Sequence, residues 1–246
     1  MGTEKGEYMS KVIGIMGESG SGKTTSLRNL DPTTTFYIDC DKKGLSWKGW
    51  RKQYNAENGN YYKTDDKNEV MRSLAWLNCD NGTYAAYQKI LGKNATVLTE
   101  DMKAKAHSFK TVVIDTLNGI MVADEVERMK EKGYDKWMDL AQCVWDLLNY
   151  INTMRDDLTV IVLCHSQTQK EDDGYTFTRI KTSGKKLDKL NVESKLTTVL
   201  YATANGGEYK FQTHADHSTA KTPMGAIEEN SIPNDIMIVI KALEDY

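Results

Sequence analysis

The stretch that decides the fold is Gly17-Glu18-Ser19-Gly20-Ser21-Gly22-Lys23-Thr24, which matches the phosphate-binding pattern G-x-x-x-x-G-K-[ST]. An apolar run at residues 12–16 precedes it and predicts a β-strand, while residues 25–30 after it predict the first turns of a helix. The glycines lack a Cβ, so successive backbone N–H groups can turn inward toward an anion, and the start of a helix adds its own unpaired N–H groups. Because strand, glycine-rich turn and helix are the context that the pattern requires, the sequence predicts a site for the phosphates of a nucleotide.

The polar residues of this loop have expected tasks. Lys23 is placed to bridge the β- and γ-phosphates, and the hydroxyl of Thr24 to hold Mg²⁺. The full set of expected phosphate-binding residues is Gly17, Glu18, Ser19, Gly20, Ser21, Gly22, Lys23, Thr24 and Thr25.

The apolar run at residues 109–114 predicts a buried strand that ends in Asp115. A carboxylate at the carboxyl end of a buried strand beside Thr24 can hold Mg²⁺ or a water molecule bound to it. Many strands end in aspartate, but after a phosphate loop this pattern is typical of a Walker B motif. We therefore expect Thr24 and Asp115 to form the metal site.

Two other predicted strands also end in polar residues. Asp39 and Asp41 follow the run at residues 33–38, and His165 follows the run at residues 158–164. In a parallel sheet the carboxyl ends of the strands share one edge, where ligands bind. Asp39 and Asp41 are either functional residues or ordinary turn residues, and His165 is either a sensor of the γ-phosphate or a structural residue.

Alternating strand and helix patterns predict an α/β fold, a P-loop NTPase domain with a mostly parallel sheet flanked by helices. Residues 197–204 and 208–213 predict a C-terminal antiparallel β-hairpin. We expect one domain over residues 1–246, with a surface insertion at residues 79–108.

Two helices are expected between the Asp115 and His165 strands, at residues 118–132 and 135–154. The apolar residues of the first, which include Val122, Val126 and Met129, are expected to pack on the sheet.

The composition is that of a globular protein with a polar surface: 39% of the residues are hydrophobic, 27% are charged and the net charge is −3. No apolar run approaches the ~20 residues that span a membrane, and the first residues lack the apolar core of a signal peptide. We therefore expect a cytoplasmic protein with no membrane partner. The four cysteines form no C-x-x-C pair and are expected to be buried free thiols.

Two stretches have a composition that suits nucleic acid. Arg179, Lys181, Lys185 and Lys186 lie in the densest run of positive charge, which predicts a nucleic-acid groove, a contact between subunits or a solvated loop. Residues 44–63 mix aromatic and cationic side chains, which predicts either base stacking or a helix whose tryptophans pack on the core.

Together these motifs resemble a RecA-type ATPase core. More narrowly, the sequence is similar to small phage-encoded AAA-domain P-loop ATPases, a core-only group like RecA and RadA that is linked to single-strand annealing and recombination. The resemblance covers nearly the whole chain except residues 79–108. The stretches that carry it are residues 17–24, Asp115-Thr116-Leu117-Asn118, His165, Thr182-Ser183-Gly184-Lys185, Thr219-Ala220-Lys221-Thr222-Pro223-Met224-Gly225 and Ile232-Pro233-Asn234-Asp235.

The resemblance implies ATP and Mg²⁺ as cofactors, with Lys23, Asp41, Asp115 and His165 as catalytic residues. The general base of the family, usually glutamate, falls on Asp41, which is one methylene shorter and implies slow hydrolysis. His165 stands where RecA-like proteins carry a glutamine or asparagine sensor. Lys221 matches a lysine that would reach the nucleotide of a neighbouring subunit and neutralise charge, as arginine fingers do.

The resemblance also implies partners and a function. Single-stranded DNA, further copies of the chain and a single-stranded-DNA-binding protein are expected, in the host cytoplasm if the protein is phage-encoded. The predicted function is Mg²⁺-dependent ATP hydrolysis coupled to DNA recombination or single-strand annealing. Two alternatives stay open: a phosphotransferase to a small molecule or nucleotide, which needs an acceptor, and a nucleotide-gated scaffold with negligible turnover.

Overall fold

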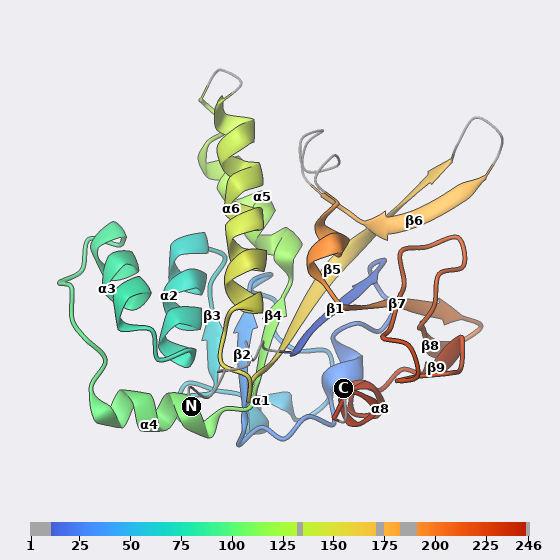
Figure 1. Ribbon diagram of the computed structural model, residues 1–246, viewed down its shortest axis with the longest axis horizontal. Coiled ribbons are helices and arrows are strands. Elements are labelled where there is room, and N and C mark those ends of the chain that lie inside the picture. The colour runs from blue at the N-terminus through green and yellow to red at the C-terminus, as the bar shows by residue number, and fades with distance from the viewer. Residues whose placement is uncertain (1–10, 132–134, 171–174, 183–190, 245–246) are drawn as a thin grey trace, which may run out of the picture.

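Strands and helices alternate along the chain in the computed structural model, which describes residues 11–131, 135–170, 175–182 and 191–244. Within these residues the strands form one sheet in the order β3-β2-β4-β5-β1-β7-β8-β9, and β6 pairs with β5 (Figure 1). The strands are β1 (Lys11–Gly17), β2 (Thr35–Asp39), β3 (Tyr61–Lys63), β4 (Thr111–Asp115), β5 (Thr159–Lys170), β6 (Thr176–Ile180), β7 (Thr198–Asn205), β8 (Glu208–Gln212) and β9 (Ser231–Pro233).

Most of the sheet is parallel, which confirms the predicted α/β class and the RecA-like core. Parallel pairings join β3, β2, β4, β5, β1 and β7. The last strands, β8 and β9, pair in antiparallel fashion, so the predicted C-terminal hairpin is β7–β8. The carboxyl ends of the parallel strands therefore meet at one edge, where ligands bind in such sheets.

Side chains along each central strand alternate between two hydrophobic clusters, one on each face of the sheet. On one face, Val112 and Ile114 pack with α2 (Lys67–Leu77), α5 (Leu117–Glu127) and α6 (Asp135–Asn152). On the other face, Val113 belongs to a cluster with residues of the 3₁₀ turn η1 (Thr25–Leu27), α1 (Trp50–Gln53) and α8 (Ile236–Ala242). Burial on both faces explains why these strands read as continuous apolar runs.

Five helices begin at a side chain that accepts hydrogen bonds from the backbone of their first turn, as Asp and Thr do at helix N-termini. This cap terminates the preceding loop and fixes where each helix starts. The capping residues are Asp66 for α2, Asp80 for α3 (Asn81–Ile90), Thr99 for α4 (Glu100–Ser108), Thr116 for α5 and Asp235 for α8.

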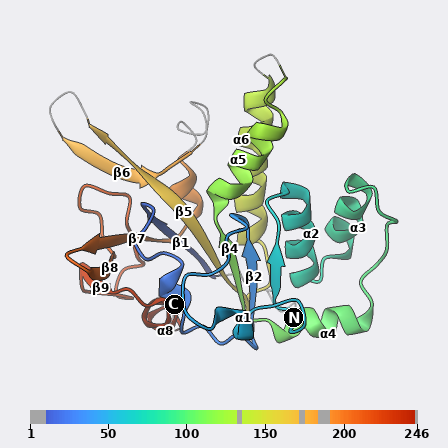
Figure 2. The same cartoon turned by 180° about the vertical axis from the view of Figure 1, so that it is seen from behind.

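The segment expected as an insertion forms α3 and α4, which pack on α2. Tyr84 and Leu98 make a small hydrophobic cluster with Ala75, and the indole of Trp76 donates to the carbonyl of Met102 at 2.9 Å. In both views these helices lie at the opposite end of the molecule from β8 and β9 (Figures 1 and 2). That the segment is an insertion stays a prediction.

The prediction of a helix directly after the phosphate loop is wrong, because the chain forms only the short 3₁₀ turn η1 there. Ser26 turns its hydroxyl back to the carbonyl of Lys23 at 2.6 Å, and Pro32 disfavours helix just before it. The place beside this turn is taken by α8, since Arg28 donates to the carbonyl of Asn234 at 3.0 Å and Asn29 donates to Asp235 at 2.6 Å.

The prediction that the apolar residues in the second half of α5 and just after it pack on the sheet is also wrong. Leu117, Ile120 and Met121 are buried, but Val122, Val126 and Met129 are exposed. The reason is that α5 starts at the carboxyl edge of the sheet and leaves it, while α6 returns over the sheet face (Figure 1).

The polar stretch after His165 contains a strand that the sequence did not suggest. β5 continues to Lys170 and pairs antiparallel with β6, and this hairpin projects from the body of the sheet in both views (Figures 1 and 2).

The aromatic residues of 44–63 belong to the core rather than to an exposed stacking surface. Trp47 and Trp50 pack against one of the two core clusters, and their rings contact those of Tyr54 and Tyr61. None of the helices in the described part of the chain has the length and hydropathy of a membrane span.

Candidate active site

A cavity of about 480 Å³ lies at the carboxyl edge of the sheet, beside the phosphate loop. Its size is in the usual range for a small-molecule site. Predicted residues that line it are Ser19, Gly20, Gly22, Lys23, Thr24, Thr25, Asp115 and His165, and Lys43, Ser46, Thr116 and Tyr209 complete the lining. Gly17, Glu18, Ser21 and Asp41 were also predicted and are not among the residues that line it.

The glycine-rich loop leaves no room for a side chain at Gly22. This residue has φ of 89°, and a Cβ there would lie 2.8 Å from the ring of Tyr209 and 3.1 Å from the amide oxygen of Asn234. Only glycine combines this left-handed backbone with so close an approach. The loop is therefore shaped from outside by β8 and by the residue before α8.

The amine of Lys23 is folded back onto its own loop. It donates to the carbonyls of Gly17 and Glu18, both at 2.7 Å, and only 7% of the residue is exposed. Burial lowers the pKa of Lys23, although the charge of Asp115 opposes this shift. A phosphate in the cavity would offer this amine a charged acceptor in place of two neutral carbonyls.

Asp115 is a buried carboxylate that faces the loop. Its Oδ2 accepts from the hydroxyl of Thr24 at 2.9 Å and from that of Tyr37 at 2.6 Å. Its Oδ1 is buried and has no hydrogen-bond partner among the described residues. Burial raises the pKa of Asp115, while the bond from Tyr37 counteracts it. A buried carboxylate oxygen without a donor is costly unless a cation compensates it.

The residues present fit Mg²⁺. Mg²⁺ takes oxygen ligands and usually binds through one or two carboxylates together with substrate phosphates and water. Thr24 and Asp115 would supply a hydroxyl and a carboxylate oxygen. No group of three or more His, Cys, Asp or Glu side chains placed to hold a metal occurs among the described residues, so the remaining ligands would come from nucleotide and water.

Asp41 lies in the turn after β2, next to the cavity residues Lys43 and Thr116, which both donate to it. Its Oδ1 accepts from the hydroxyl of Thr116 at 2.9 Å and its Oδ2 from the amine of Lys43 at 2.5 Å. Burial would raise the pKa of Asp41, but the hydrogen bonds from Lys43 and Thr116 outweigh it and lower the pKa. Asp41 is therefore ionised at neutral pH, with both of its oxygens occupied.

Asp39 has the structural role of a turn residue. Its carboxylate accepts from the backbone N–H of Gly44 at 2.8 Å and from the hydroxyl of Tyr61 at 2.5 Å. These bonds fold the 40–44 turn back over the strand end. The N–H groups of Cys40 and Asp41 also donate to the carbonyl of Asp115, at 2.6 and 3.2 Å, which ties the turn to β4.

His165 lies where β5 leaves the core. Its backbone N–H donates to the side-chain oxygen of Asn118 at 2.6 Å, and the amide nitrogen of Asn118 donates to the carbonyl of Lys181 at 2.8 Å. The N–H of Lys181 returns a bond to the carbonyl of His165 at 2.7 Å. Burial and the charge of Lys23 lower the pKa of His165, so its ring is neutral at pH 7. Asn118 thus joins the cavity to the base of the β5–β6 hairpin.

The predicted cationic residues are only partly placed by the structure. Arg179 lies on β6 and Lys181 directly follows that strand with its side chain exposed, whereas Lys185 and Lys186 fall outside the described residues. Lys221 pairs through its backbone with Val199, and burial lowers the pKa of its amine. Lys221 is not among the residues that line the cavity, so its action on a neighbouring subunit stays a prediction.

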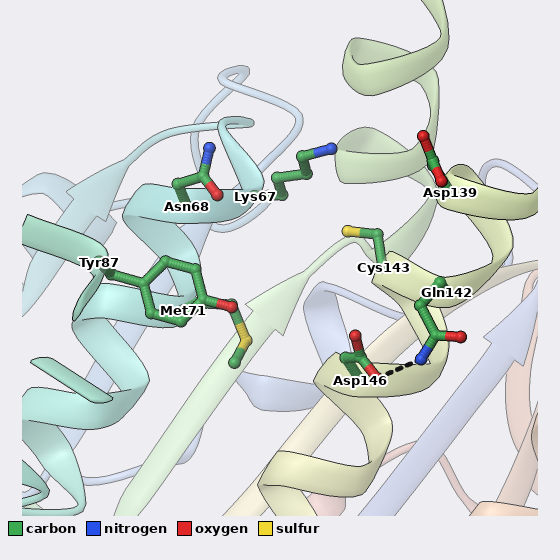
Figure 3. A pocket seen from close by; sticks show the side chains of 8 residues that line it. All are labelled: Lys67, Asn68, Met71, Tyr87, Asp139, Gln142, Cys143 and Asp146. Carbon is green, nitrogen blue, oxygen red and sulfur yellow. Dashed lines mark hydrogen bonds between the residues drawn. The ribbon is translucent and has the colours of Figure 1, made fainter. Parts of the chain in front are cut away.

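A second hollow, of about 240 Å³, lies between α2, α3 and α6 (Figure 3). The amine of Lys67 in its wall is 2.9 Å from both carboxylate oxygens of Asp124, and the amide of Gln142 donates to Asp146 at 2.6 Å. Its wall has no glycine loop, and its one lysine is already paired. Phosphate is therefore better accommodated at the first cavity. The residues that line the hollow are Lys67, Asn68, Met71, Tyr87, Asp139, Gln142, Cys143 and Asp146.

Reasoning from the sequence missed residues that line the first cavity, including Lys43 and Tyr209, and two that bond to residues lining it, Tyr37 and Asn118. Lys43 follows the second strand by a few residues and could have been found by applying the strand-end argument one turn further. Tyr37 carries no motif of its own, and Asn118 was part of the stretch Asp115-Thr116-Leu117-Asn118 that carries the resemblance but had no expected task. Tyr209 reaches the loop from the far end of the sheet, and no local signal indicates it.

Comparison with known proteins gives one family. No curated protein matches the sequence. The family described as "AAA domain" matches residues 9–224, which is most of the chain and includes the phosphate loop, Asp115 and His165. Membership of this family indicates nucleotide binding and hydrolysis, and AAA-type P-loop domains typically bind nucleotide with Mg²⁺. The chain belongs to the AAA domain family and is an AAA-type P-loop ATPase domain.

Proposed function

We propose that the protein hydrolyses ATP in a Mg²⁺-dependent reaction at the cavity beside the phosphate loop. The observation that carries this proposal is the contact between Thr24 and Asp115, with the second oxygen of Asp115 buried and unpartnered among the described residues. Loop, hydroxyl and carboxylate meet as a metal-bound triphosphate requires.

The chemical step follows from the residues around the cavity. Water attacks the γ-phosphorus, the bond from that phosphorus to the β–γ bridging oxygen breaks, and ADP and phosphate leave. Asp41 accepts the proton of the water, and Lys23 stabilises negative charge on the phosphates. Bound Mg²⁺ would neutralise charge on the phosphate oxygens. Because both oxygens of Asp41 are occupied, we expect slow turnover in the absence of a stimulating partner.

We further propose that this activity serves DNA recombination or single-strand annealing in phage, with single-stranded DNA bound at the β5–β6 hairpin. The rings of Tyr175 and Phe177 are stacked at 6.4 Å on this hairpin, and Lys170 and Lys181 are exposed on it. Aromatic rings beside cations suit single-stranded nucleic acid. β5 connects the hairpin directly to His165 in the cavity wall.

The same proposal includes assembly. We expect copies of the chain to associate on DNA in the host cytoplasm, with Lys221 of one subunit near the nucleotide of another, and a single-stranded-DNA-binding protein as a further partner. No structural observation favours a phosphotransferase over an ATPase.

The test is ATP turnover by the purified protein at low salt, with and without single-stranded DNA, together with solution mass. We expect slow hydrolysis that DNA stimulates, and loss of nucleotide binding in Lys23→Ala. A Lys23→Ala protein with full turnover would refute the site. To test DNA binding at the hairpin, the double variant Lys170→Ala/Lys181→Ala should show weaker stimulation of ATP turnover by DNA. The control is the double variant Lys48→Ala/Lys241→Ala, which removes two exposed lysines outside the hairpin and should leave the stimulation unchanged.

The occupied carboxylate of Asp41 favours a second candidate, a nucleotide-gated scaffold. In that case ATP would bind and change the solution mass with no measurable turnover, even when DNA is present.

A further inference from the structure

Two consecutive lysines after β2 reach different partners. Lys42 adopts φ of 57°, and its amine pairs with Asp65 at 2.5 Å. Lys43 lines the cavity together with Lys23, Thr24 and Asp115. Its amine is paired with Asp41 instead of lying free in the cavity. The turn therefore presents one lysine to the phosphate site and keeps the other away from it.

The turn holds Lys43 at the cavity through its backbone. Asp39 accepts the N–H of Gly44, and the carbonyl of Asp115 accepts the N–H of Cys40 and of Asp41. These bonds do not involve the amine of Lys43, so that amine can change partners while the turn stays in place.

The pair between Lys43 and Asp41 is open to solvent on the lysine side. The side chain of Lys43 is 55% exposed, so water and salt screen its charge in part, whereas the side chain of Asp41 is 16% exposed. A terminal phosphate has three acceptor oxygens that share a charge of about −2, and it is a stronger acceptor for an ammonium group than one carboxylate oxygen. Thr116 would still hold Oδ1 of Asp41 at 2.9 Å when Lys43 leaves Oδ2.

We propose that Lys43 is a second phosphate-binding lysine, which leaves Asp41 for the γ-phosphate and so frees Oδ2 of Asp41 to accept the proton of the attacking water. This inference rests on the proposed ATPase function. It assigns Lys43 two tasks: recognition of a triphosphate over a diphosphate, and restraint of the base until a triphosphate is bound.

The experiment measures the dissociation constants of ADP and of a non-hydrolysable ATP analogue, both with Mg²⁺, by calorimetry. Lys43→Ala should weaken the analogue by about tenfold or more, since a charge-assisted bond is lost, and leave ADP within about twofold. Lys42→Ala is the matched control and should change neither. Retained ADP binding shows that the variant pocket is folded, and Lys43→Gln replaces Lys43→Ala if the latter does not fold.

A double-mutant cycle tests the exchange of partners. Asp41→Asn removes the competitor for Lys43, so it should strengthen analogue binding more in the wild-type background than in Lys43→Ala. An equal gain in analogue affinity in both backgrounds would mean that the charge of Asp41 repels the phosphates without involving Lys43. That result would overturn the proposed exchange of partners.

The failures of the two proposals differ. A wild-type protein that binds and hydrolyses ATP, with a Lys43→Ala variant of unchanged preference for the analogue over ADP, overturns the role of Lys43 alone. A wild-type protein that binds no nucleotide overturns the ATPase proposal and this inference with it.

Discussion

Replacement of Asp115 by asparagine separates the metal role of this residue from its structural role. The side chain is 1% exposed, and its Oδ2 accepts from Thr24 and Tyr37. The amide oxygen of asparagine can accept the same two bonds. The amide nitrogen would replace Oδ1, which has no partner among the described residues, so one buried unpartnered atom replaces another.

The expected magnitudes follow from this exchange. Loss of the buried charge stabilises the free protein and a buried NH₂ without an acceptor destabilises it, each by about 1–3 kcal/mol, so we expect a net change within about 1 kcal/mol. For a chain of this size that is roughly 2–4 °C in Tm. A ligand at one hundred times its dissociation constant adds about 2.7 kcal/mol to the wild type, or roughly 5–10 °C.

The assay is thermal denaturation with nucleotide, in the presence and absence of Mg²⁺. Wild-type protein should gain stability when Mg²⁺ is added to the nucleotide, and Asp115→Asn should not. Asp124→Asn is the matched control, because Asp124 is also a buried carboxylate but pairs with Lys67 and is not among the residues that line the cavity. If Asp115→Asn keeps the wild-type Mg²⁺ effect, the metal is not held by this carboxylate.

Three further changes test other parts of the structure. Gly22→Ala forces a left-handed backbone on a residue with a Cβ, at about 1–2 kcal/mol, and should weaken nucleotide binding in calorimetry; unchanged affinity would contradict the loop geometry. Asn118→Ala removes the bonds to His165 and Lys181, so denaturant unfolding should show a loss of about 2 kcal/mol or more in the free energy of unfolding, and DNA should no longer stimulate turnover. A stable variant that still responds to DNA would argue against a link from the hairpin to the cavity through Asn118. Asp80→Ala removes the cap of α3 and should lower the free energy of unfolding by about 1 kcal/mol at pH 7. Burial raises the pKa of Asp80, but the hydrogen bonds to its carboxylate lower that pKa by more, so this difference in stability from wild type should disappear as the pH falls through the lowered pKa. A stability difference that persists in acid would refute the cap.

The sequence predicted the features that depend on local patterns. Apolar runs ending in Asp39 and Asp115 located two strand ends, and the run before His165 located the point where the parallel pairing of β5 stops, although that strand continues to Lys170. The rule that parallel strands share a carboxyl edge placed Asp115 and His165 beside the phosphate loop. Both residues line the cavity with Lys23. Their chemical roles stay predictions.

The features that depend on distant contacts were not predictable in the same way. Residues 25–30 have a helical pattern, but whether they continue as a helix depends on α8, which occupies the adjoining space. Val126 has the spacing of a sheet-facing residue, and its exposure follows from the direction in which α5 leaves the sheet. The pairing of Lys43 with Asp41 depends on a turn geometry that spacing alone does not specify.

The contacts between the phosphate loop and the end of the sheet have a consequence for synthesis on the ribosome. Arg28 bonds to Asn234 across 206 residues, and Asn234 also borders Gly22. At a translation rate of ~5–20 residues per second, the ribosome adds Asn234 roughly 10–40 s after it has added the phosphate loop. Nucleotide capture should therefore begin late in translation, after the strands of the core have been made.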